Sequence, residues 1–77
     1  MTNEQWTTLK SGDHILPVSN GRPGTVLVEL HMKDHVGRWI GVAYKGAVGL
    51  NSLVVNEVPE CWALVQPAPG GQFKAVR

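Results

Sequence analysis

The sequence predicts an all-β protein in which five short strands close into a small barrel, followed by a flexible C-terminal tail. Apolar and polar residues alternate with a period of two in several short segments, which is the pattern of half-buried strands. Gly, Pro and Asn gather between these segments, where tight turns are expected. No segment carries a long apolar stripe at helical spacing, and closing the strands into a barrel removes exposed sheet edges.

The length and composition favour one small folded domain. The chain has 77 residues, of which 43% are hydrophobic and 17% charged, a composition typical of folded proteins. Cys61 is the only cysteine and excludes an internal disulfide. The first residues lack the basic start and apolar run of a signal peptide, and no apolar run is long enough to span a bilayer. We therefore expect a cytoplasmic protein without membrane contact, and its small core makes self-association a natural way to bury more surface.

The first predicted elements are an extended segment, a strand and a turn. Thr2 and Gln5 have the spacing of a capping box, but the neighbouring threonines favour extended structure, which we expect there. Residues 11–18 are predicted to contain a turn and the first strand, in which Pro17 suits a strand edge because it lacks a backbone donor. The Asn-Gly and Pro-Gly pairs in 19–24 predict that the chain reverses direction.

Alternation also predicts which side chains of the middle strands face the core. The second strand, in 25–32, is expected to bury one set of alternating apolar residues: Val26, Val28, Leu30 and Met32. In the third strand, 38–44, we expect Ile40 and Val42 to face the core, so that Trp39 and Gly41 face outward.

Two further strands complete the predicted domain. They lie in 50–57 and 61–65, separated by a break at a Val-Pro pair, and Trp62 on the last strand is expected to face the core. The barrel domain therefore comprises residues 1–66. Residues 67–77 are rich in Pro and Gly and are predicted to form a flexible tail.

Aromatic residues mark the predicted binding surface. An outward Trp39 beside Gly41 would present an uncovered ring, and large exposed aromatics are enriched at the energetic centres of interfaces. The turn that follows Tyr44 is expected to bring that ring to the rim of the same surface. The candidate ligand-binding residues are Arg38, Trp39, Tyr44, Asn51 and Trp62.

Two segments resemble SH3 domains. The run LKSGDHILPV is similar to their Lys-x-Gly-Asp-x-Ile segment, and RWIGVAYKGAVGL is similar to their Trp-x-Gly, turn, Gly-x-x-Gly-Leu segment. The resemblance implies a small barrel that binds a ligand on its surface. The aromatic start and the Pro-x-Asn-Tyr-Val ending, which build the polyproline groove of those domains, are both replaced here. We therefore expect a ligand other than polyproline.

The start of the chain also resembles the KOW segment of ribosomal and transcription proteins. The residues at its Gly-Asp and Gly-x-x-Gly-x-Val positions are Gly12, Asp13, Gly21, Gly24 and Val26. The resemblance implies a loop near Arg22 that meets RNA or a protein. The alternative interpretation is an ordinary hairpin, which any small barrel needs.

A third resemblance is to the plasmid-borne type II dihydrofolate reductases, SH3-like barrels of similar length whose copies surround a central active-site pore. Their Val-Gln-Ile-Tyr run binds both ligands. The residues at that place are Val48, Gly49, Leu50 and Asn51. Pro17 stands at the place of a pore lysine. Because the glutamine, the tyrosine and the lysine are all replaced, the resemblance implies the fold of these enzymes without their chemistry.

No catalytic or metal-binding constellation stands out. His31 and His35, with Asp34 between them, would converge on zinc only in a helix, whereas this segment runs from a strand into a turn. Cys61 has no signature of an activated nucleophile and is expected to be a small core residue. We therefore predict no catalytic residue, no metal and no cofactor.

The predicted function is a non-enzymatic binding module that contacts a protein partner, or a second copy of itself, through an exposed aromatic face. The net charge is +1 and the basic residues are dispersed, which disfavours nucleic acid. A KOW-like nucleic-acid-binding module remains an alternative, and it would be favoured if the following residues converged beside Trp39: Lys10, Arg22, Arg38 and Lys45. A tetrameric enzyme like the type II dihydrofolate reductases is the other alternative.

Overall fold

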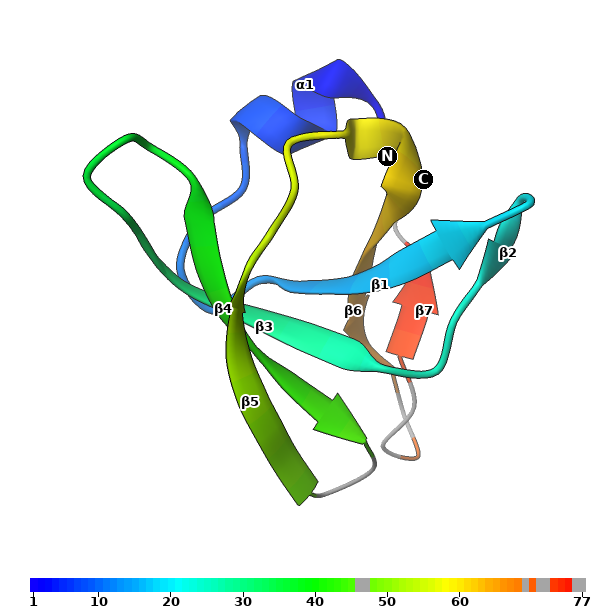
Figure 1. Ribbon diagram of the computed structural model, residues 1–77. Helices are drawn as coiled ribbons and strands as arrows, with labels where there is room; N and C mark the ends of the chain where they lie inside the picture. The colour runs from blue at the N-terminus through cyan, green and yellow to red at the C-terminus, as the bar shows by residue number, and fades with distance from the viewer. Residues whose placement is uncertain (46–47, 69, 71–72, 76–77) are drawn as a thin grey trace.

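The computed structural model describes residues 1–45, 48–68, 70 and 73–75, and within them the strands form one antiparallel sheet. The elements are α1 (Asn3–Thr7), β1 (His14–Ser19), β2 (Arg22–Pro23), β3 (Leu27–Lys33), β4 (Trp39–Lys45), β5 (Val48–Val54), the 3-10 helix η1 (Pro59–Cys61), β6 (Trp62–Pro67) and β7 (Phe73–Ala75). The strand order is β5-β4-β3-β1-β6-β7, and β2 pairs with β1. Figure 1 shows α1 and η1 together at one end of a strongly bent sheet.

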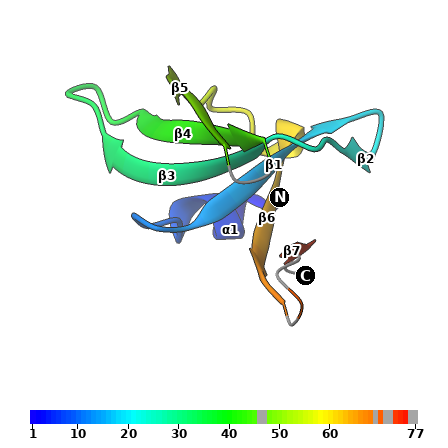
Figure 2. The same ribbon diagram turned by 90° about the horizontal axis from the view of Figure 1, so that it is seen from below.

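The predicted all-β class is confirmed, but the predicted number of strands is wrong, and the strand pairings of the described residues leave the sheet open at β5 and β7 rather than closed into a barrel. Among the described residues there are seven strands and not five, because β2 and β7 are additional. Figure 2 shows β3 and β4 side by side, with β1 crossing toward β6 on the other side of the bend. Because β1 pairs with β3 and also with β6, it joins the two halves of the sheet.

The segment before β1 forms the helix α1, so the expectation of extended structure is wrong there. The backbone N–H of Gln5 donates to Oγ1 of Thr2, and the backbone N–H of Thr2 donates to Oε1 of Gln5, each at 3.0 Å. This reciprocal capping box satisfies two otherwise unpaired donors. Met1 and Trp6 flank it and both pack against the core, which fixes the helix on the sheet.

The predicted chain reversal after β1 is confirmed. Asn20 and Gly21 form the turn, and both have positive φ angles, 54° and 74°. Two consecutive residues of this conformation match the right-handed twist of a hairpin, which explains the Asn-Gly pair. Ser19 and Arg22 are cross-strand partners on either side of it.

In β3 the predicted core face holds for Val28 and Leu30 and fails for Met32. Val28 is 2% exposed and Leu30 is fully buried, whereas 61% of Met32 is exposed. The register between β3 and β4 shifts after Leu30, so His31 is an extra residue and Met32 turns to the opposite face. The hydroxyl of Ser11 donates to the carbonyl of His31 and holds this bulge in place.

In β4 the predicted faces are reversed. Trp39, Gly41 and Ala43 are buried, whereas Ile40 and Val42 are only partly covered. A Cβ atom on Gly41 would lie 2.7 Å from Cγ1 of Val28, so glycine here allows a close approach of β3 and β4. The face of β4 that carries the large ring of Trp39 therefore packs on the core.

The core cluster draws on most of the chain and includes both buried tryptophans: Leu9, Ile15, Val28, Leu30, Trp39, Ala43, Val55 and Trp62. The expectation that Trp62 faces the core is confirmed. Its indole Nε1 donates to Asn56, with Oδ1 at 2.7 Å and the backbone oxygen at 3.2 Å, so the buried donor is satisfied. Cys61 is a free, partly buried cysteine that packs against this cluster.

The C-terminal tail was predicted to be flexible, but Phe73–Ala75 forms strand β7 on β6. The ring centroid of Phe73 lies 5.0 Å from that of His14 on β1, and this contact gives the strand a side-chain anchor that composition alone does not reveal. The other tail residues from 69 onward, except Gly70, lie outside the described residues. Within the described part of the chain, no helix is long and apolar enough to cross a membrane.

Candidate functional site

The structure does not gather the five residues predicted to form a binding surface. Trp39 is 7% exposed and Trp62 is 8% exposed, so both rings belong to the core, and the prediction of an outward Trp39 is wrong. Arg38 is exposed just before β4, and Tyr44 lies six positions along the strand, about 20 Å away at about 3.3 Å per residue. Asn51 is exposed on β5. Arg38 and Trp39 are consecutive in the chain, but Trp39 is buried. Apart from them, only Tyr44 and Asn51 of the predicted surface lie near each other, in the β4–β5 hairpin.

Arg38 has a structural partner in the turn between β3 and β4. Its backbone N–H donates to Oδ1 of Asp34 at 2.8 Å, and its Nε donates to Oδ2 at 2.9 Å. The backbone N–H of Val36 donates to Oδ1 of Asp34 at 3.0 Å. These donors, led by the Arg38 backbone, lower the pKa of Asp34 below its usual 3.8 although partial removal from water opposes them. Arg38 and Asp34 therefore build the turn.

This carboxylate gives the turn a predictable dependence on pH. Because the pKa of Asp34 is lower in the folded chain than in the unfolded one, its contribution to stability is complete above 3.8 and is lost as the pH falls through the lowered value. We expect urea denaturation of the Asp34→Asn variant to depend less on pH in that acidic range than denaturation of the wild type. Glu60→Gln, at an exposed residue away from β5, is the control and should follow the wild type. If the wild type and the Asp34→Asn variant lost stability equally as the pH falls, the role of Asp34 would be contradicted.

The more informative surface is the side of β3, β4 and β5 that faces away from the core. We call this the outer face, and its residues are Leu27, Glu29, Met32, Ile40, Val42, Tyr44, Ser52 and Val54. They form three cross-strand rows: Leu27 with Tyr44, Glu29 with Val42 and Ser52, and Met32 with Ile40 and Val54. Apart from Glu29 and Ser52, every one is apolar or aromatic.

Among the described residues, the apolar side chains of the outer face are partly buried or exposed. Met32 is 61% exposed and Val54 49%, and the apolar side chains between them are only partly buried. A sheet that packs one face on a core normally carries polar residues on the other face, which meets water. Here both faces are largely apolar.

One carboxylate lies within this face and is held by two imidazoles. Oε2 of Glu29 is 3.1 Å from Nε2 of His14, and its Oε1 is 2.9 Å from Nε2 of His31. His14 is the cross-strand partner of Glu29 and also contacts the ring of Phe73. Glu29 is thus fixed at the margin between the apolar outer face and the strand β1. Among the described residues, no group of three or more ligating side chains is arranged to hold a metal ion.

Strand β5 forms one edge of the sheet and extends the apolar surface to that edge. Val48 is 63% exposed and Leu50 is 50% exposed, and the strand VGLNSLV contains no charged residue and no proline. A Cβ atom on Gly49 would lie 3.4 Å from Cε1 of Tyr44, so the Tyr44 ring extends over the bare backbone of Gly49 toward the edge. The edge is therefore flanked by apolar groups and lacks the charges that usually guard an edge strand.

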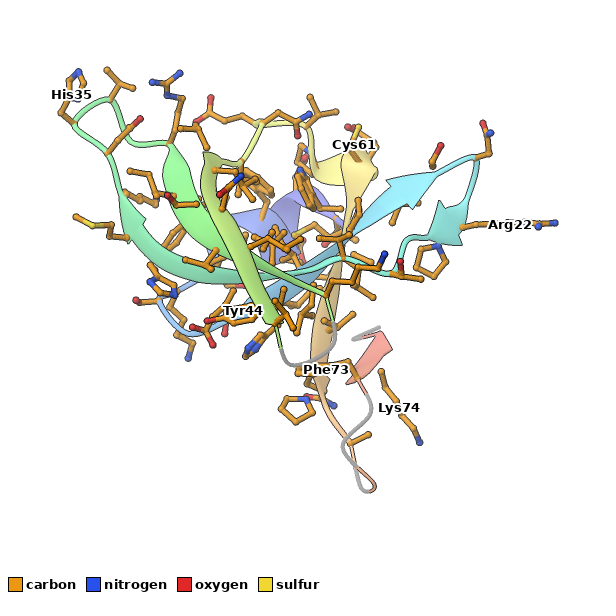
Figure 3. All side chains as sticks on the ribbon, turned by 60° about the horizontal axis from the view of Figure 1, so that its bottom comes forward. Arg22, His35, Tyr44, Cys61, Phe73 and Lys74 are labelled. Atoms are coloured by element: carbon orange, nitrogen blue, oxygen red, sulfur yellow. The ribbon has the colours of Figure 1, made fainter. Side chains whose placement is uncertain are left out.

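Among the described residues, the basic side chains do not converge on any of these features. Arg22 projects from the β1–β2 hairpin, and Figure 3 shows it at the opposite end of the molecule from His35 in the β3–β4 turn. Arg38 is paired with Asp34 in that turn, and Nζ of Lys33 lies 5.2 Å from the centroid of the Trp39 ring. The convergence beside Trp39 that would favour nucleic acid is not found.

No protein-family model matches the chain, and no curated protein and no solved structure is significantly similar to it. Function is therefore inferred from the chemistry of the outer face and of the β5 edge.

The sequence contains a signal for the outer face that alternation alone does not reveal. Every residue from Trp39 to Tyr44 is apolar, aromatic or glycine, so either face of β4 fits a core. Such a continuous run is typical of a strand covered on both sides. The run therefore indicates that β4 carries apolar side chains on both of its faces.

Proposed function

We propose that the chain is a non-enzymatic protein-interaction module with an SH3-like arrangement of strands, and that its contact surface is the outer face. The observation that carries the proposal is the partly exposed apolar surface of β3, β4 and β5, with Met32 61% and Val54 49% exposed. Uncovered apolar patches of this kind mark interaction sites in soluble proteins.

The arrangement of strands supports the SH3-like part of the proposal. β3, β4 and β5 follow one another as an antiparallel meander, and β1 pairs with β3 on one side and β6 on the other. The bend at β1 lets the two halves of the sheet enclose one small core. The SH3-like segments of the sequence lie at β1 and along the β4–β5 hairpin.

Two features favour a protein ligand over nucleic acid. The outer face is apolar and has Glu29 as its charged residue, which would repel a phosphate backbone. Arg22 in the β1–β2 hairpin lies at the opposite end of the molecule from the β3–β4 turn that holds Arg38, whereas useful affinity for nucleic acid needs several clustered cations.

Ligand selection from a randomised peptide library displayed on phage tests the proposal. We expect selected peptides to shift the amide resonances of Leu27, Val42 and Tyr44 in a labelled chain. Met32→Glu should weaken their binding at least about tenfold, because it places a charge in a surface from which a bound ligand would exclude water. Val36→Glu is the matched control, since Val36 is 60% exposed but lies in the β3–β4 turn.

Other outcomes would favour the alternatives. Single-stranded RNA that binds with a steep salt dependence would support a nucleic-acid module. Turnover of dihydrofolate with NADPH would support the enzyme, and we expect none above background because glycine at position 49 lacks the amide of the related motif. Peptides that bind equally well to the wild type and to Met32→Glu would show that the outer face is not the contact surface.

A further inference from the structure

We infer that strand β5 pairs antiparallel with β5 of a second copy of this chain, on a two-fold axis at Leu53. This rests on the proposed function, because it names the partner that extends the interaction surface. The edge has an uncharged and proline-free sequence, exposed valine and leucine side chains, and free backbone groups whose spacing fits the same strand in a second copy.

The free backbone groups of the edge follow from the pairing of β5 with β4. The backbone N–H of Val55 donates to the carbonyl of Trp39 at 2.8 Å. Hydrogen-bonded and non-hydrogen-bonded partners alternate along an antiparallel ladder, so Val55 and Leu53 direct their backbone groups toward β4. Ser52 and Val54, the partners of Val42 and Ile40, therefore direct their N–H and C=O groups to the open side.

The free backbone groups of one β5 strand are complementary to those of β5 in a second copy related by a two-fold axis. With the axis at Leu53, Ser52 of each copy lies opposite Val54 of the other, and the pair of strands forms about four hydrogen bonds. Ser52 and Val54 both belong to the outer face, so opposing side chains share one face as the pleat requires. The two outer faces then become continuous across the axis.

The bulge in the hairpin selects this position for the axis. The register shifts between Val42 and Tyr44, and Leu50 and Asn51 together face Ala43. Alternation is interrupted there, so an axis at Ser52 would oppose Val54 to Leu50, which points to the other face. The regular ladder resumes at Ser52, and an axis at Leu53 uses only this regular half.

Charges at the two ends of β5 favour a second copy over an unrelated strand. Lys45 is the cross-strand partner of Val48 at one end, and Glu57 follows Val54 at the other end. Both side chains are exposed, and neither makes an ion pair among the described residues. Antiparallel pairing brings opposite ends of the two strands together, so that Lys45 of each copy, on β4 one strand behind the edge, lies at the same end of the interface as Glu57 of the other, twice per dimer.

Sedimentation over a range of protein concentrations tests this arrangement. We expect a reversible dimer with a dissociation constant in the micromolar range, since one strand edge buries less area than a standard interface. Hydrogen exchange should show the amides of Ser52 and Val54 becoming protected as the concentration rises, while the amide of Asn20 at the β1–β2 turn does not change.

A charge exchange tests the direction and register of the pairing. Lys45→Glu and Glu57→Lys should each weaken the dimer about five- to tenfold, because each change sets like charges together at both ends. The double variant carrying both changes should regain wild-type affinity. The control double variant Lys10→Glu with Glu60→Lys has the same net charge, changes exposed residues away from β5, and should dimerise normally. Circular dichroism verifies that each variant folds.

Several results would overturn the inference. They are a monomer at every concentration, single variants that dimerise like the wild type, and a double variant no better than either single one. If the chain were monomeric but its selected peptides still lost affinity in Met32→Glu, only the inferred dimer would be overturned, and the proposed interaction module would stand. If the chain dimerised but bound no peptide, the proposal of a different protein as ligand would be contradicted, and self-association would remain as the role of this surface.

Discussion

Replacing Trp39 by Ala is expected to cost about 3–5 kcal/mol of folding stability, which is the usual range for removing a buried aromatic side chain. The ring is 7% exposed, belongs to the core cluster, and has Nζ of Lys33 5.2 Å from its centroid. A chain of this length is expected to be stable by roughly 4–12 kcal/mol in total, so the variant should lie close to unfolding at room temperature.

Urea denaturation followed by circular dichroism measures this effect. Trp39→Phe keeps part of the buried ring and should give a smaller loss that remains measurable if Trp39→Ala does not fold. Met32→Ala is the control on the outer face, where 61% of the side chain is exposed, and it should change stability by less than about 0.5 kcal/mol. Equal stability of Trp39→Ala and the wild type would show that the ring is not part of the core.

The sequence was sufficient for the class of fold and for several local elements. Alternation located β3 and the β4–β5 hairpin, and the Asn20–Gly21 pair located the first reversal because its positive φ angles require those residue types. The burial of Val28, Leu30 and Trp62 also followed from the pattern. These features depend on local backbone chemistry or on strongly apolar positions, which a single sequence displays.

The errors arose where a choice depended on contacts between distant residues. Alternation in β4 allowed two faces, and the core took the one with Trp39, because Gly41 lets the backbone of β3 approach closely there. Alternation places Met32 in the core because the bulge at His31, held by Ser11 twenty positions earlier, has no local signature in the sequence. The same limit applies to the candidate site. The sequence predicts Tyr44 and Asn51 as surface residues, but it does not reveal the cross-strand rows of the outer face, because these depend on the registers of three strands.

The second large effect is expected at Gly41, where substitution by Ala should destabilise the fold by about 1–3 kcal/mol. Elsewhere in a strand this change is neutral or stabilising, because Ala restricts the unfolded chain more than Gly does. At Gly41 the added Cβ would lie 2.7 Å from Cγ1 of Val28 and 2.8 Å from the carbonyl oxygen of Glu29. The oxygen belongs to the backbone of the paired strand, so relief requires β3 and β4 to move apart beneath the outer face.

Two comparisons assign the effect to this close approach. Gly49→Ala is the matched control in the adjacent strand, because its Cβ would meet only the Tyr44 ring at an ordinary 3.4 Å, and we expect a change within about 0.5 kcal/mol. In a Val28→Ala background, the cost of Gly41→Ala should fall by about 0.5 kcal/mol or more, since one of the two clashing atoms is gone while the Glu29 oxygen remains. Denaturation midpoints of the four chains in this cycle measure the coupling. Strictly additive costs would remove Val28 from the explanation, and a stabilised Gly41→Ala variant would show that β3 and β4 do not approach as closely as the structure places them.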